Sequence, residues 1–162
     1  MRFDGIATLA DIYLDGQLIG SADNMNRVWE YDITPMVMDG SADTVYRLKV
    51  VLHSPTRFIA EADGKCPVGG SSDAMPGFPH IRKAACMFGW DWGGRLPDAG
   101  LFREVSVLSY KTARIAQVYI GQEHTVTGKN VHGNVVSSVQ LTAAAEIEWM
   151  PAAASEKVKL AF

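Results

Sequence analysis

The feature that most constrains the fold is a strand pattern that leads directly into a turn. Over residues 10–15, Ala10, Ile12 and Leu14 alternate with Asp or Tyr, which is the two-residue period of a half-buried strand. Asp15-Gly16 follows, and a second apolar run begins at residue 17. Asp-Gly favours a type I′ turn, because both central positions of that turn need a positive φ. The sequence therefore predicts an antiparallel hairpin.

Further strands are expected along most of the chain. Alternating or face-sharing apolar residues mark residues 46–52, 102–109, 116–120, 135–143 and 158–162, with a short linker at Lys111 and Thr112. Residues 143–148 have helical propensity, but the alternation before them favours a strand, and no convincing amphipathic helix is found. Short strands separated by turn signals predict an all-β fold of the sandwich or jelly-roll type.

Residues 54–80 have a different composition. Prolines stand at 55, 67, 76 and 79, glycines are frequent, and no hydrophobic period is visible. We therefore expect a long loop there, and loops of this length are usually functional or disordered.

Composition and charge exclude several classes. The 15 Lys and Arg against 18 Asp and Glu give a net charge of −3, which argues against nucleic-acid binding. The longest apolar run, residues 84–88, is far shorter than the ~20 residues of a membrane span. No signal peptide is visible at residue 1, but an internal segment of a larger protein would not show one, so the compartment stays open. Neither the four histidines nor Cys66 and Cys86 have zinc-site spacing, so we expect no metal or cofactor.

Trp90-Asp91-Trp92, bracketed by glycines, is the most informative chemical motif. An indole offers a flat apolar surface for the C–H face of a pyranose, and a carboxylate accepts strong hydrogen bonds from its hydroxyls. The alternative is that both tryptophans are core residues and Asp91 caps a turn. Arg82, Lys83 and Arg95 are either partners of Asp91 or a solvated positive patch.

Several segments in one order resemble the β-mannosidase branch of glycoside hydrolase family 2. They are Ala10–Gly16, Gly20–Met25, Tyr31–Thr34, Leu52–Pro55, Ile81–Gly93, Leu96-Pro97 and Gly100–Arg103. Residues 113–162 resemble, less specifically, the start of the immunoglobulin-like domain of such enzymes. One departure is Gly94, where the family usually has proline, so a freer loop is expected.

The resemblance implies a galactose-binding-like, partial jelly-roll β-sandwich over residues 1–111, followed over 112–162 by an incomplete immunoglobulin-like β-sandwich. It also implies that Asp91 binds sugar hydroxyls at the rim of an active site, with Trp90 and Trp92 shaping the pocket and Arg82 supporting it. The catalytic carboxylates of such enzymes lie on a later barrel, and the acid/base Glu follows an Asn. No Asn-Glu dipeptide occurs here, so this chain alone is expected to be inactive.

The resemblance further implies that strands of the complete domains are missing from this chain. Unpaired strand edges and uncovered apolar faces would then favour self-association or strand swapping. Three functions stay open: a non-catalytic segment contributing recognition of a β-mannoside-type carbohydrate, an independent carbohydrate-binding module, and a purely structural or oligomerising segment.

Overall fold

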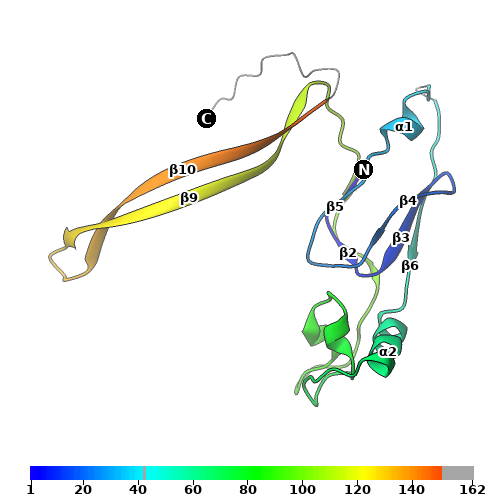
Figure 1. The fold of residues 1–162 in the computed structure, drawn as a ribbon, viewed down its shortest axis with the longest axis horizontal. Coiled ribbons are helices and arrows are strands. Elements are labelled where there is room, and N and C mark those ends of the chain that lie inside the picture. Colours follow the sequence, from blue (N-terminus) through cyan, green and yellow to red (C-terminus); the bar gives the residue numbers. More distant parts are fainter. Residues whose placement is uncertain (42, 151–162) are drawn as a thin grey trace. The chain divides into compact units, whose positions relative to one another are not determined.

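The computed structural model describes residues 1–41 and 43–150, which form two units (Figure 1). The first unit is Met1–Leu108, and the second begins at Ser109. The domain division expected at residues 111 and 112 stays a prediction. The strand expected at residues 158–162 lies outside the described residues.

The central sheet of the first unit contains the predicted hairpin. Strand β3 (Ala10–Leu14) pairs antiparallel with β4 (Gln17–Ala22) on one side and with β6 (Leu48–Leu52) on the other. Asp15 and Gly16 have φ values of 47° and 84°, as a type I′ turn requires. Residues 10, 12 and 14 are buried and the two between them are partly exposed. Both the hairpin and its buried face are therefore confirmed.

Two smaller sheets join segments that are distant in the sequence. Strand β1 (Arg2–Phe3) lies between β5 (Trp29–Glu30) and β8 (Val105–Ser106), and β2 (Ile6–Ala7) pairs with β7 (Gly100–Leu101). The strand expected over residues 102–109 is thus reduced to β8. These sheets and the central sheet share one apolar core, formed by Phe3, Ile6, Ala10, Ile12 and Ala22.

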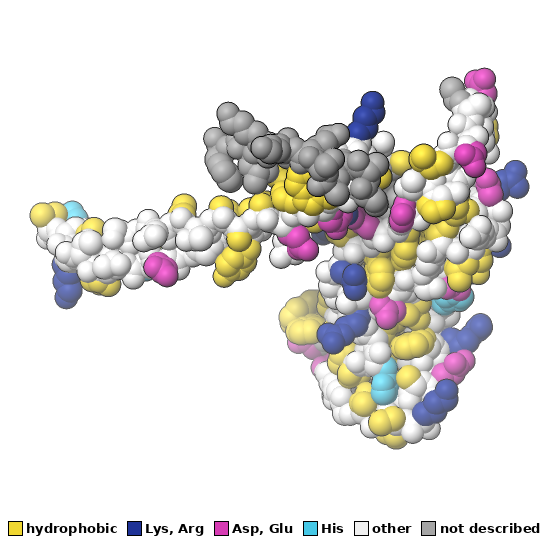
Figure 2. Space-filling model, turned by 45° about the horizontal axis from the view of Figure 1, so that its top comes forward, with side chains coloured by type: hydrophobic (Ala, Val, Ile, Leu, Met, Phe, Trp, Pro, Cys, Tyr) yellow, Lys and Arg dark blue, Asp and Glu magenta, His cyan; other side chains and the backbone are white. Residues whose placement is uncertain are grey.

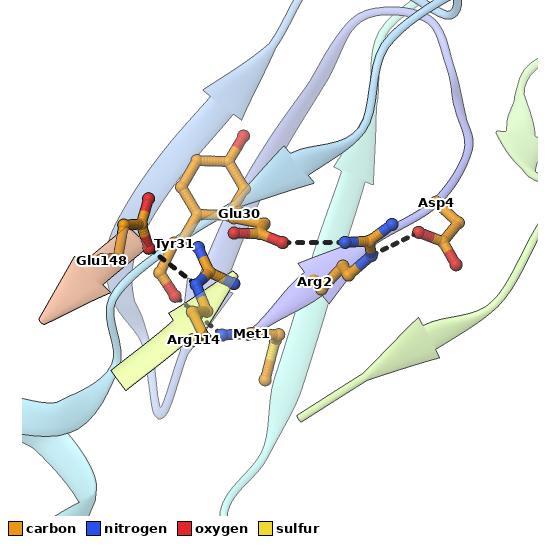
Figure 3. A network of polar contacts seen from close by, with 7 residues as sticks. All are labelled: Met1, Arg2, Asp4, Glu30, Tyr31, Arg114 and Glu148. Carbon is orange, nitrogen blue, oxygen red and sulfur yellow. Dashed lines mark hydrogen bonds and ion pairs between the residues drawn. The ribbon is translucent and has the colours of Figure 1, made fainter. Parts of the chain in front are cut away.

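An ion-pair chain supports the pairing of β1 with β5. The guanidinium of Arg2 donates from Nε to Asp4 at 2.6 Å and from Nη1 to Glu30 at 3.0 Å (Figure 3). Arg2 and Glu30 are also register partners across the two strands. The three side chains are partly exposed, so each pair contributes at most about 1 kcal/mol.

The prediction of a structureless loop over residues 54–80 was wrong. Helix α2 occupies Pro55–Lys65, where Ser54 is its N-cap and accepts a hydrogen bond from the Arg57 amide at 3.2 Å. The helix buries only Pro55 and Ile59, so its apolar stripe is too narrow to show as a period. The local signal was Ser54 followed by proline at the first helical position.

Three shorter helical segments complete the first unit. They are α1 (Thr34–Val37) and the 3₁₀ turns η1 (Phe78–His80) and η2 (Ala85–Phe88). A second apolar cluster, formed by Ile59, Ala74, Ile81 and Phe88, packs α2 against the segment that carries the two 3₁₀ turns.

The second unit is described as one long hairpin. Strand β9 (Ala113–Lys129) pairs antiparallel with β10 (Val135–Trp149), which confirms that residues 143–148 are strand rather than helix. Arg114 and Glu148 face each other across it, with Nε 2.6 Å from the carboxylate (Figure 3). Hydrophobic side chains lie exposed along the hairpin (Figure 2), among them Ile115, Val118, Ile120, Val126, Val139 and Leu141.

The described chain is mainly strand with few helical segments, so the all-β prediction is confirmed. Within it, no helix is long and apolar enough to cross a membrane.

Candidate functional site

The motif singled out by the sequence forms a tight turn. Trp90 and Gly93 are bridged in both directions, with the Trp90 amide donating to the Gly93 carbonyl at 3.3 Å and the Gly93 amide donating back at 3.2 Å. Asp91 and Trp92 are therefore the two central residues of a four-residue turn. This geometry places the carboxylate and the second indole at its tip.

The two indoles of this turn are exposed to solvent. Trp90 is 48% exposed and Trp92 is 82% exposed. Their ring centroids lie 5.5 Å apart and the planes are inclined by 56°. The alternative that both tryptophans are core residues was therefore wrong. The rings form a small, tilted aromatic surface that a ligand can reach.

The Asp91 carboxylate is exposed, and within the described part of the chain it makes no hydrogen bond or ion pair. The nearby cations have other partners. Lys83 Nζ lies 3.6 Å from Asp98, and the Arg95 guanidinium donates to the carbonyls of Asp73 and Ser72 at 3.1 and 3.3 Å. The acceptor capacity of Asp91 is thus available for hydroxyl donors.

Arg82 directly precedes the buried Lys83 in the sequence, and the turn follows both residues. Its backbone carbonyl accepts a hydrogen bond from the Met25 amide at 3.0 Å, and its side chain is exposed. Among the described residues no hydrogen bond or ion pair joins Arg82 to Asp91. The structure therefore brings Trp90, Asp91 and Trp92 together, and a supporting role for Arg82 stays a prediction.

The base of the turn is anchored more firmly than its tip. Phe88 is fully buried and stacks on Phe78 at 6.2 Å, and its carbonyl accepts a hydrogen bond from Met75. Gly89 has a φ of 127°, and a Cβ there would lie 2.4 Å from the Asp73 carbonyl oxygen. Only glycine fits this close approach. Sequence reasoning missed these anchors, although Gly89 itself was a visible signal.

The described residues contain no cluster of three or more His, Cys, Asp or Glu side chains that could hold a metal ion. The two cysteines are free, and both are exposed.

The fold agrees with a family assignment. Residues 1–103 match the model of the family described as "Glycosyl hydrolase 2 galactose-binding domain-like". Because this match covers more than half of the chain, the chain belongs to that family, and residues 1–103 are its galactose-binding-like domain.

Similar curated proteins are β-mannosidases. The chain is 33% identical to the β-mannosidase of Mus musculus over 124 residues, which covers 70% of this chain and 13% of that protein. It is 30% identical to β-mannosidase B of Emericella nidulans over 151 residues, which covers 90% of this chain and 16% of that protein. The chain therefore spans about one seventh of the length of these relatives.

A solved structure shows the same fold. The β-D-mannosidase from Dictyoglomus thermophilum superposes with a TM-score of 0.65 and 22% sequence identity, covering 92% of this chain and 21% of that one. This likeness supports the β-sandwich assignment.

Proposed function

We propose that this chain contributes carbohydrate recognition, without catalysis of its own, to a glycoside hydrolase of the β-mannosidase type. The exposed turn at Trp90–Gly93 is the proposed contact surface, and the sugar is a β-mannoside. The single observation that carries the proposal is the Asp91 carboxylate, which has no partner among the described residues and lies beside two exposed indoles.

The chemistry of the turn suits a pyranose. The tilted indoles offer apolar surface to the C–H groups of the ring, while Asp91 accepts hydrogen bonds from neighbouring hydroxyls. Because Asp91 has no partner in the part of the chain that the structure describes, it loses no bond to those residues when it binds a hydroxyl. The anchored base at Phe88 and Gly89 limits the motion of the backbone, which reduces the entropy lost on binding.

The non-catalytic part of the proposal rests on the relatives and on the sequence. The chain aligns with about one seventh of the length of the β-mannosidases reported above. It also contains no Asn-Glu dipeptide, which the resemblance associates with the acid/base residue. Glycoside hydrolysis normally uses two carboxylic acids that flank the scissile bond. We therefore expect the purified chain not to hydrolyse a chromogenic β-mannoside.

Recognition is tested by NMR, because the chain has only four tryptophans. A ¹⁵N-labelled chain is titrated with β-1,4-mannotriose while the four indole Nε1–H signals are followed. Saturable chemical-shift changes are expected at Trp90 and Trp92, with a dissociation constant in the millimolar range. Trp29 is an internal control, because its Nε1 already donates to the Asn24 carbonyl at 3.0 Å.

Two variants complete the test. Asp91→Ala is expected to weaken the shifts, while Asp39→Ala, which changes an exposed carboxylate on another loop, is expected to leave them unchanged. Tight binding by the isolated chain would favour an independent carbohydrate-binding module. Unchanged indole signals of Trp90 and Trp92 throughout the titration would favour a purely structural segment and would contradict the proposal.

A further inference from the structure

A second concave surface lies between the central sheet and α2, and its lining does not include the tryptophan turn (Trp90–Gly93). Its volume is about 390 Å³, within the roughly 300–1,000 Å³ of small-molecule pockets. Ala10 and Ala22, which are register partners on β3 and β4, belong to its lining and are both buried. Because both have only a methyl group, space is left at this end of the sheet.

One side of the hollow is a fixed polar network. Asp11 Oδ1 accepts a hydrogen bond from the Ser21 hydroxyl at 2.6 Å, and Asp11 Oδ2 lies 2.8 Å from His53 Nε2. Asp11 and Ser21 are register partners on β3 and β4, and His53 directly follows β6. Two strand positions of the central sheet and the residue after a third strand therefore place an oriented carboxylate and an imidazole at the rim.

The other side comes from one face of α2. Glu61 lies four residues after Arg57 and three after Phe58, so it is a neighbour of both on that face. Within the described part of the chain, neither the Arg57 guanidinium nor the Glu61 carboxylate has a side-chain hydrogen bond or ion pair. The Phe58 ring is 40% exposed. The helix thus presents a donor group, an acceptor group and an apolar ring to the same hollow.

We propose that this hollow is a second ligand site, which takes a neutral polyhydroxylated compound of monosaccharide size. The Phe58 ring would contact the C–H face of the ligand, while Arg57 donates to its hydroxyls and Glu61 accepts from them. Charged side chains of both signs line the hollow, which favours a neutral ligand: Asp11 and Glu61 are acidic and Arg57 is basic. An anion would face Asp11 and Glu61, and a cation would face Arg57.

This site is independent of the function proposed for the tryptophan turn. None of its lining residues lies between residues 62 and 108, so each site can fail while the other binds. Signals from each site therefore report it separately.

The test is a titration of the labelled full chain with methyl β-D-mannopyranoside. The His53 ring signals and the backbone amides of Thr56, Arg57 and Phe58 are followed. Saturable shifts are expected at these positions. Arg57→Ala and Glu61→Gln are each expected to weaken the apparent affinity about five- to tenfold, the loss of one charge-assisted hydrogen bond.

The controls separate this site from the first and from simple charge effects. Lys65→Ala removes a cation from the other end of α2, and Asp91→Asn alters the tryptophan turn; both are expected to leave the affinity at His53 unchanged. The proposal would be overturned if these signals showed no saturable shift with the sugar. It would also be overturned if Arg57→Ala and Glu61→Gln bound the sugar with the affinity of the unsubstituted chain, or if inorganic phosphate saturated the same signals as the sugar does.

Discussion

Lys83 Nζ lies 3.6 Å from Asp98 Oδ1, yet the Lys83 side chain is fully buried while the Asp98 side chain is 76% exposed. The ammonium has no hydrogen-bond partner in the described residues that meets ordinary geometry. Burial lowers the pKa of Lys83, and the nearby Asp98 opposes that shift. The desolvation of the ammonium is therefore only partly offset by Asp98.

Replacing this lysine by an apolar side chain of similar length is expected to preserve or raise stability. Lys83→Met removes the buried charge and leaves Asp98 solvated, so the free energy of unfolding should stay equal or rise by about 1 kcal/mol. Asp98→Ala removes the ion-pair partner of the buried ammonium and should lower stability by about 1–2 kcal/mol. Urea unfolding followed by circular dichroism measures both. A Lys83→Met chain less stable than Asp98→Ala would refute this account.

Acid sensitivity is expected from Asp11. Hydrogen bonds from Ser21 and then His53 hold the pKa of Asp11 below its ordinary value of 3.8. A carboxyl whose pKa is lowered by folding stabilises the native state fully above that ordinary value, and the contribution is lost as the pH falls through the lowered value. The stability of the chain should therefore decline below about pH 4.

Asp11→Asn should flatten that decline. The decline does not vanish, because hydrogen bonds with Thr34 also lower the pKa of Asp32. Thermal unfolding at several pH values from neutral to acid measures how steeply stability falls with pH. Asp39→Asn is the matched exposed control. Equal slopes for the Asp11→Asn chain and the unsubstituted chain would contradict the assignment to Asp11.

Gly89 is expected to be intolerant of any side chain. In Gly89→Ala the new Cβ would lie 2.4 Å from the Asp73 carbonyl oxygen and 2.8 Å from Arg95 Cγ, at a φ of 127°. We expect a loss of about 2 kcal/mol or more in unfolding free energy. Gly94→Ala is the matched control, since its Cβ would meet only Leu96 at 3.5 Å or more. Similar urea midpoints for the two variants would show that the Gly89 backbone can relax.

The sequence predicted best what is determined locally. The hairpin of β3 and β4 follows from alternation over residues 10–15 and from the φ preferences of Asp15-Gly16, which are properties of neighbouring residues. Strands β1 and β2 were missed, because each has two residues and is defined by partners far along the chain. Helix α2 was missed because it buries only two side chains.

In the candidate site, too, the sequence predicted what neighbouring residues determine and missed what distant contacts determine. Spacing and residue type identified Trp90, Asp91 and Trp92, but spacing does not reveal the tertiary contacts that Phe88 and Arg95 make on either side of them. The hollow beside α2 was invisible for a similar reason. Asp11, His53 and Arg57 come from three elements, and one of these is the helix that the sequence analysis did not predict.

Self-association of the chain remains a prediction, and the second unit provides its most direct test. Within the described residues β9 and β10 pair only with each other, and Val118 and Ile120 are more than half exposed. Because exposed apolar strand surface favours pairing between chains, the mean mass should rise with chain concentration. Light scattering behind a sizing column, over about a hundredfold range of concentration, measures this. Ile120→Lys should shift the equilibrium toward monomer, whereas Thr125→Lys, at a polar position of β9, should do so less. A mass that stays monomeric throughout would refute the prediction.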